Sequence, residues 1–84
     1  MSYSVDWLPQ AEKGLGHVWL AASDRVSVTF AANRIDQMLA HDPQQRGRWL
    51  YGTTRLLIVP PLAVIFDVIA DDKRVNVLTC WREE

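Results

Sequence analysis

Three runs of apolar, largely β-branched residues dominate the second half of the chain. Short turn signals separate these runs, which predicts three antiparallel strands. The middle run is apolar on both faces apart from Asp67, as is typical of a central strand that is covered on at least one side. We therefore expect a meander formed by Arg55–Val59, Leu62–Ile69 and Arg74–Trp81, with Pro60-Pro61 and the polar stretch 70–73 between them.

The first half of the chain changes from a period of two to a helical period. Residues 2–7 alternate apolar and polar side chains, which predicts another strand. Apolar positions three and four apart then predict two helices. The first helix is expected from Pro9 to about Ala22, where Ser23-Asp24 ends it and offers an N-cap for the next helix. The second helix is expected from Asp24 to about His41, where Asp42-Pro43 stops it. A short link between two helices favours an antiparallel hairpin, whose apolar face would cover the sheet.

Glycines and a polar segment complete this pattern. Gly14 and Gly16 each weaken the first helix by roughly 1 kcal/mol relative to Ala, and we expect them to let another element approach closely. The segment Gln44–Thr54 is polar and contains two glycines, so it is predicted to be a loop in which Trp49, Leu50 and Tyr51 act as anchors. The predicted fold class is α+β, in the order β-α-α-β-β-β, with a helical hairpin packed on a small antiparallel sheet.

Length and composition favour a small soluble protein. The 84 residues suffice for one domain, 1–84, and 49% of them are apolar. The formal charge of −1 argues against an obligate nucleic-acid binder, although a local basic patch remains compatible with it. A single Cys80 excludes an intrachain disulfide and a cysteine zinc site. We expect a cytoplasmic protein, because neither a signal peptide nor an apolar run of about 20 residues is present.

Few residues suggest chemistry. The chain has no glycine-rich phosphate loop, nucleophile elbow or metal-ligand spacing, so no cofactor and no metal are expected. One group of basic residues is a candidate site: Arg46, Arg48, Arg55 and Arg82. The first and third strands of a meander run in the same direction, so we expect Arg55 and Arg82 at opposite ends of the sheet. Surface arginines are commonly solvated, and this is the simpler interpretation of the group.

One ordered set of features extends from Tyr3 to Arg82. It comprises the strand Tyr3–Trp7, the helical hairpin with Ala11 and Leu15, Arg34-Ile35-Asp36 with Leu39, Asp42-Pro43, the Gly47 loop, Arg55-Leu56, Val64–Val68 and Val75–Leu78. In order and length, this set resembles the RelE/ParE superfamily of bacterial toxins. The resemblance implies a helical hairpin on a small antiparallel sheet, and the role of toxin in a type II toxin–antitoxin pair.

The resemblance also implies two alternative mechanisms. RelE-like members cut messenger RNA in the ribosome with clustered basic residues and a C-terminal Tyr or His, whereas ParE-like members bind DNA gyrase. Arg55 and Arg82 match two of the basic positions. However, Leu62-Ala63 stands where the nucleases usually have an arginine, and no Tyr or His follows Trp81. The resemblance therefore favours a ParE-like toxin that acts by binding a protein.

Three functions are kept as hypotheses. The first is a toxin of a plasmid-stabilisation-like system, neutralised by a cognate antitoxin that lays an amphipathic helix or an added strand on the fold. Trp49 and Trp81 would then be contacts for a partner. The second is a ribosome-dependent mRNA endoribonuclease with an altered site, in which Arg55 and Arg82 are catalytic and Arg46 and Arg48 bind substrate. The third is a non-toxic interaction module on the same scaffold. Expected partners are the antitoxin and either gyrase or the ribosome with its message, without a membrane, and a homodimer stays open.

Overall fold

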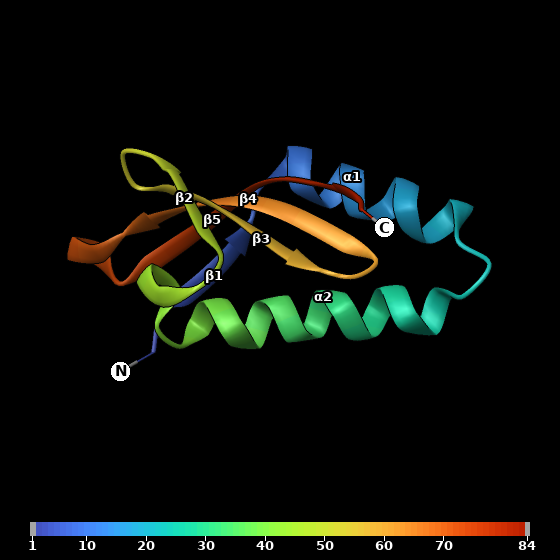
Figure 1. Cartoon of the computed structure of the whole chain (residues 1–84), viewed down its shortest axis with the longest axis horizontal. Coiled ribbons are helices and arrows are strands. Elements are labelled where there is room, and N and C mark those ends of the chain that lie inside the picture. Colours follow the sequence, from blue (N-terminus) through green and yellow to red (C-terminus); the bar gives the residue numbers. More distant parts are fainter. Residues whose placement is uncertain (1, 84) are drawn as a thin grey trace.

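Two helices of an antiparallel hairpin cover one face of a five-stranded sheet (Figure 1). The computed structural model describes residues 2–83. Its elements are β1 (Ser4–Trp7), α1 (Pro9–Ala21), α2 (Arg25–Ala40), β2 (Arg48–Tyr51), β3 (Thr54–Val59), β4 (Leu62–Ile69) and β5 (Arg74–Arg82), with single 3-10 turns at Pro43–Gln45 and Ala70–Asp72. The predicted α+β class and both predicted helices are confirmed. No helix within residues 2–83 is long and apolar enough to cross a membrane.

The sheet is mixed, with the strand order β1-β5-β4-β3-β2. Strands β3, β4 and β5 form the predicted antiparallel meander, and β4 is central. The N-terminal strand β1 adds to the outer edge of β5 in parallel, with Val5 beside Val75 and Trp7 beside Val77. This pairing places the apolar face of β1 over the same core. The period of two in residues 2–7 specifies which side chains are buried, but not the direction in which the strand pairs.

The prediction that Gln44–Thr54 forms a loop is wrong in part, because β2 lies inside it and pairs with β3. A tight turn containing Gly52 connects the two strands, and the Trp49 indole Nε1 donates a hydrogen bond to the Gly52 carbonyl at 2.9 Å. Three of the four residues of β2 are exposed. An edge strand of this kind buries neither face, so its sequence carries no alternation of apolar and polar residues from which it could be predicted.

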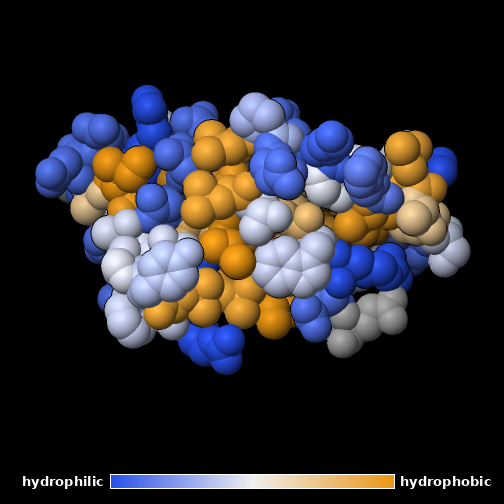
Figure 2. Space-filling model, turned by 90° about the horizontal axis from the view of Figure 1, so that it is seen from above, coloured by the Kyte–Doolittle hydropathy of each residue, from blue (hydrophilic) through white to orange (hydrophobic). Residues whose placement is uncertain are grey.

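The core lies between the hairpin and the sheet. Its fully buried side chains include Val28, Ile35 and Leu39 of α2 and Phe66 of β4. Apolar side chains also reach the surface, and Figure 2 shows them gathered in a band across the middle of the face that is seen from above, with hydrophilic groups on either side. The polar exception in β4, Asp67, lies on the sheet face away from the helices.

The two glycines of α1 differ. A Cβ atom on Gly14 would lie 2.2 Å from the carbonyl oxygen of Cys80, so α1 rests directly on the backbone of β5. This confirms the close approach that the sequence predicted there. A Cβ atom on Gly16 would meet nothing within 4 Å, and the same prediction is wrong at that position.

Both helices have polar caps at the turn that joins them. The Asp24 carboxylate accepts hydrogen bonds from the backbone N–H of Ser27 at 3.1 Å and from its hydroxyl at 2.6 Å. These bonds lower the pKa of Asp24, and they confirm the predicted N-cap of α2. The guanidinium of Arg25 donates to the carbonyls of Trp19 and Leu20 at the end of α1 and lies 4.4 Å from the Trp19 ring centre.

Candidate functional site

Two of the four candidate arginines meet where α2 ends and β3 begins. Arg46 donates through Nε to the carbonyls of Met38 and His41, at 3.3 and 3.2 Å. Arg55 in turn donates to the carbonyl of Arg46 at 2.7 Å and to that of Gly47 at 3.3 Å. The two guanidinium groups therefore hold the segment between α2 and β2 against its neighbours. Gly47 is required there, since its φ is 66° and a Cβ atom would lie 2.0 Å from the Leu56 carbonyl oxygen.

The other two arginines lie apart from this pair. Arg48 is beside Leu56 in the β2–β3 ladder, and side chains alternate between faces, so it lies on the sheet face opposite Arg55. Arg82 is beside Leu62 at one end of β4, whereas Arg55 is beside Phe66, four residues further along the strand. At about 3.3 Å per residue, this offset is roughly 13 Å. Arg55 and Arg82 thus lie at opposite ends of the sheet, as the meander predicts.

The two candidate tryptophans also lie apart. Trp49 is 60% exposed and is beside Arg55 in the sheet. Trp81 is half-buried, is beside Ala63, and donates from its indole Nε1 to the Glu83 carboxylate at 3.0 Å. Arg55 is paired with the core-facing Phe66, whereas Ala63 points to the open face of the sheet. Trp49 and Trp81 therefore lie on opposite faces and do not form one flat contact surface.

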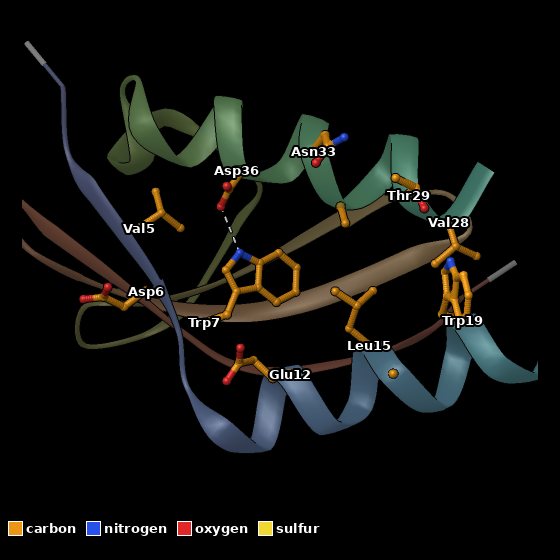
Figure 3. A pocket seen from close by; sticks show the side chains of 12 residues that line it. Val5, Asp6, Trp7, Glu12, Leu15, Trp19, Val28, Thr29, Asn33 and Asp36 are labelled. Atoms are coloured by element: carbon orange, nitrogen blue, oxygen red, sulfur yellow. Dashed lines mark hydrogen bonds between the residues drawn. The ribbon is translucent and has the colours of Figure 1, made fainter. Parts of the chain in front are cut away.

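A groove of about 730 Å³ runs between α1 and α2, and the sequence reasoning missed it. Figure 3 shows side chains from β1, α1 and α2 pointing into it, with the Trp7 ring across its middle. The indole Nε1 of Trp7 donates to the Asp36 carboxylate at 2.9 Å, which ties β1 to α2 (Figure 3). We call this feature the interhelical groove; it is lined by Val5, Asp6, Trp7, Glu12, Leu15, Gly16, Trp19, Val28, Thr29, Ala32, Asn33 and Asp36.

A smaller apolar hollow lies next to the groove, at the α1–α2 turn. It has a volume of about 300 Å³ and shares Trp19, Thr29 and Asn33 with the interhelical groove. Its rim includes Phe30, which is 73% exposed, and Val26. The hairpin therefore presents apolar surface from its middle to its tip.

Titratable groups add little to these surfaces. Burial raises the pKa of the Cys80 thiol to about 11, so at neutral pH the thiol is protonated and a poor nucleophile. Within residues 2–83, no three side chains of His, Cys, Asp or Glu are grouped so that they could hold a metal ion.

Comparison with known proteins identifies the fold. No protein-family model matches this chain, and no curated protein matches its sequence. Among solved structures, a chain of the toxin–antitoxin complex RelBE2 from Mycobacterium tuberculosis is 13% identical, with a TM-score of 0.81 over 99% of this chain and 93% of that chain. A chain of the chromosomal ParDE system of Pseudomonas aeruginosa is 20% identical, with a TM-score of 0.68 over 99% and 98%.

Two further structures show how widely this architecture occurs. A chain of the archaeal RelE–RelB complex from Pyrococcus horikoshii is 19% identical, with a TM-score of 0.69 and coverage of 98% and 96%. TrmO from Pseudomonas aeruginosa is 22% identical, with a TM-score of 0.64, and the match spans 95% of this chain but 33% of TrmO. The protein therefore has the fold of RelE and ParE toxins over nearly its whole length.

Proposed function

We propose that this chain is the toxin of a type II toxin–antitoxin system and is neutralised by a cognate antitoxin. The observation that carries the proposal is the match in fold, end to end, to chains of RelBE and ParDE toxin–antitoxin structures. Fold by itself does not fix function, so the surfaces of this chain must also support the role.

The surfaces favour action through protein contact. Stabilising a phosphate that is being cleaved requires several charged or hydrogen-bonding groups around one point. Here Arg46 and Arg55 are engaged with backbone carbonyls, and Arg82 lies at the other end of the sheet. The formal charge of −1 supplies no general attraction for RNA. Exposed apolar side chains, in contrast, are plentiful, and Trp49 is an example.

The alternative is a ribosome-dependent endoribonuclease. It is supported by the match to RelBE2 and by the match to the E. coli toxin RelE, which has a TM-score of 0.67. Arg46 and Arg55, which lie together, would then bind the backbone of the message and supply the positive charge at the cut.

Controlled expression tests the proposal. The chain is induced in a bacterial host, alone and together with the small reading frames that adjoin its gene. Growth arrest by the chain alone, relieved by one neighbouring product that co-purifies with it, is the expected result. Normal growth in both cases, with soluble and folded protein, would reject the toxin and leave the non-toxic interaction module.

Two assays then separate the mechanisms. Inhibition of supercoiling by purified DNA gyrase indicates protein contact, and cuts in a translated message, mapped by primer extension, indicate a nuclease. On the protein-contact mechanism, Trp49→Ala should weaken the arrest more than Tyr51→Ala, an equally exposed aromatic on the same strand. Loss of message cutting in Arg46→Ala and in Arg55→Ala, with the fold intact, would instead support the nuclease.

A further inference from the structure

The outward face of α2 carries two large apolar side chains one turn apart. Val26 is 67% exposed and Phe30 is 73% exposed. Residues four apart lie on the same face of a helix, so these two side chains form one patch. In Figure 1, α2 runs along the lower side of the molecule, with the sheet and α1 both above it. The patch is therefore open to contact with another molecule.

Phe30 stands between two hollows. The hollow at the α1–α2 turn, of about 300 Å³, lies beside its ring and is also lined by Val26. A second hollow, of about 320 Å³, lies between α2 and the β3–β4 turn and is lined by Ser27, Phe30, Ala31, Arg34, Val59 and Pro60. One surface thus carries both a projecting aromatic ring and recesses that can receive such a ring.

Two opposite charges stand on one flank of α2. Arg34 lines the second hollow and makes no hydrogen bond or ion pair within residues 2–83. Asp24 is exposed and accepts hydrogen bonds from Ser27, which lines the same hollow. The cation and the anion are ten residues apart, which is about 15 Å along the helix axis, so they are too distant to pair within one chain.

These features fit a two-fold axis that passes α2 level with residues 28 and 29. The midpoint of Val26 and Phe30 is residue 28, so two antiparallel copies of α2 bring Phe30 of one against Val26 of the other. The midpoint of Asp24 and Arg34 is residue 29, so the same register brings Arg34 of one copy to Asp24 of the other. A two-fold interface requires this self-complementarity, because every contact in it occurs twice.

Neighbouring charges do not oppose this register. The two Arg34 side chains would lie about 16 Å apart along the helix axes, which is more than the Debye length of about 8 Å at physiological salt. Arg25 already donates to the carbonyls of Trp19 and Leu20. The antiparallel arrangement also sets opposite ends of the two helix dipoles side by side.

The overlap is limited to the first two turns of each helix. In this register, residues 25–32 of the two copies lie side by side over about 12 Å. The rest of each helix, with the exposed Asn33 and Gln37, extends past the partner into water. Together with the β3–β4 turns, such a contact buries about 1,000 Å² in total, at the low end of specific interfaces. We therefore expect a weak dimer, with a Kd on the order of 10–100 µM.

We propose that this chain forms a two-fold dimer through the outward face of α2. Phe30 of each copy sits in the hollow beside Val26 of the other. Arg34 of each copy pairs with Asp24 of the other across the interface. The inference goes beyond the proposed function and does not depend on it, because it rests on the shape and charge of this face alone.

Sedimentation equilibrium of the full chain, over concentrations that bracket the expected Kd, tests the dimer. Phe30→Ala should raise the Kd by about 30-fold or more, because a central aromatic contact is lost twice. Its matched control is Tyr51→Ala, which removes an exposed aromatic side chain from β2 and should leave the Kd unchanged. Because Phe30 is exposed, the midpoint of urea unfolding should stay close to that of the unaltered chain.

Arg34→Glu tests the charge pairing in the same assay. The variant would set a second acid against Asp24 at both ends of the contact, so the Kd should rise by about 5- to 50-fold, and more at low salt. Arg48→Glu is the matched control, because it changes the net charge by the same amount at an exposed position on β2.

Three results would overturn the dimer, and none of them requires a growth assay. The first is a chain that stays monomeric at every concentration, whether or not it arrests growth. The second is a dimer whose Kd is the same in Phe30→Ala and Arg34→Glu as in the unaltered chain, since its interface would then lie elsewhere. The third is a monomeric chain in which Phe30→Ala instead weakens the binding of a neighbour-encoded protein, since that protein would then occupy this face.

Discussion

The contact between α1 and β5 allows a matched pair of glycine substitutions. Gly14 and Gly16 are two residues apart in the same helix, so replacing either one by alanine changes the intrinsic helix propensity by the same amount. They differ in their surroundings, because the new Cβ atom would lie 2.2 Å from the Cys80 carbonyl oxygen at Gly14 and would meet nothing within 4 Å at Gly16. The difference between the two variants therefore isolates the cost of separating the helix from the strand.

The size of the effect follows from two terms. Alanine favours a helix over glycine by about 1 kcal/mol, so Gly16→Ala should raise the free energy of unfolding by nearly that amount. At Gly14 the neighbour is backbone and cannot rotate away, so the overpacking penalty should reach about 3 kcal/mol. The net loss for Gly14→Ala is then about 2 kcal/mol. For a domain of this size, 1 kcal/mol corresponds to about 4–8 °C in melting temperature.

Urea unfolding followed by tryptophan fluorescence measures both variants against the unaltered chain. We expect the midpoint to fall for Gly14→Ala and to rise for Gly16→Ala. Equal shifts in the same direction, or a Gly14→Ala variant as stable as the unaltered chain, would refute the close packing of α1 on β5.

Three further predictions concern single side chains. Asp24→Ala should lower the melting temperature near neutral pH. The hydrogen bonds from Ser27 lower the pKa of Asp24, so the stability that they contribute is present above pH 3.8 and is lost as the pH falls through the pKa of the folded state. Asp24→Asn is the control that retains a cap. Arg55→Ala should lower the free energy of unfolding by about 1–2 kcal/mol, because the hydrogen bonds from Arg55 to the loop containing Arg46 are lost. An unchanged midpoint of urea unfolding would contradict a stabilising role for these bonds. Cys80 should react with iodoacetamide slowly when folded and rapidly in urea at the same pH; equal rates would contradict its burial.

Much of the fold could be predicted because it depends on local patterns. The helical spacing from Ala11 to Leu39, the proline at the start of α1 and the Asp24 cap act through nearby residues, and the structure retains all three. The β-branched runs that form β3, β4 and β5 bury their alternate apolar side chains in any arrangement that covers one face of the sheet.

The candidate site was predicted less well. Arg46 and Arg55 were selected for their charge, but their hydrogen bonds go to carbonyls that only the folded loop brings within reach. Trp49 and Trp81 were selected as aromatic contacts for a partner, yet the register of the sheet puts them on opposite faces. Residue type suggested which side chains could act, and strand pairing determined which of them lie together.

The amino-acid sequence alone determined both helices, the N-terminal strand, the three strands of the meander and the residues that must leave water, because these follow from short-range geometry and from the period of the apolar positions. Tertiary structure alone decided the parallel pairing of β1, the edge strand β2 and the interhelical groove. Each of these depends on how distant segments meet. Trp7 and Gly16 carry no local mark of the groove that they line, and it exists only because α1 and α2 both rest on the sheet without closing over each other.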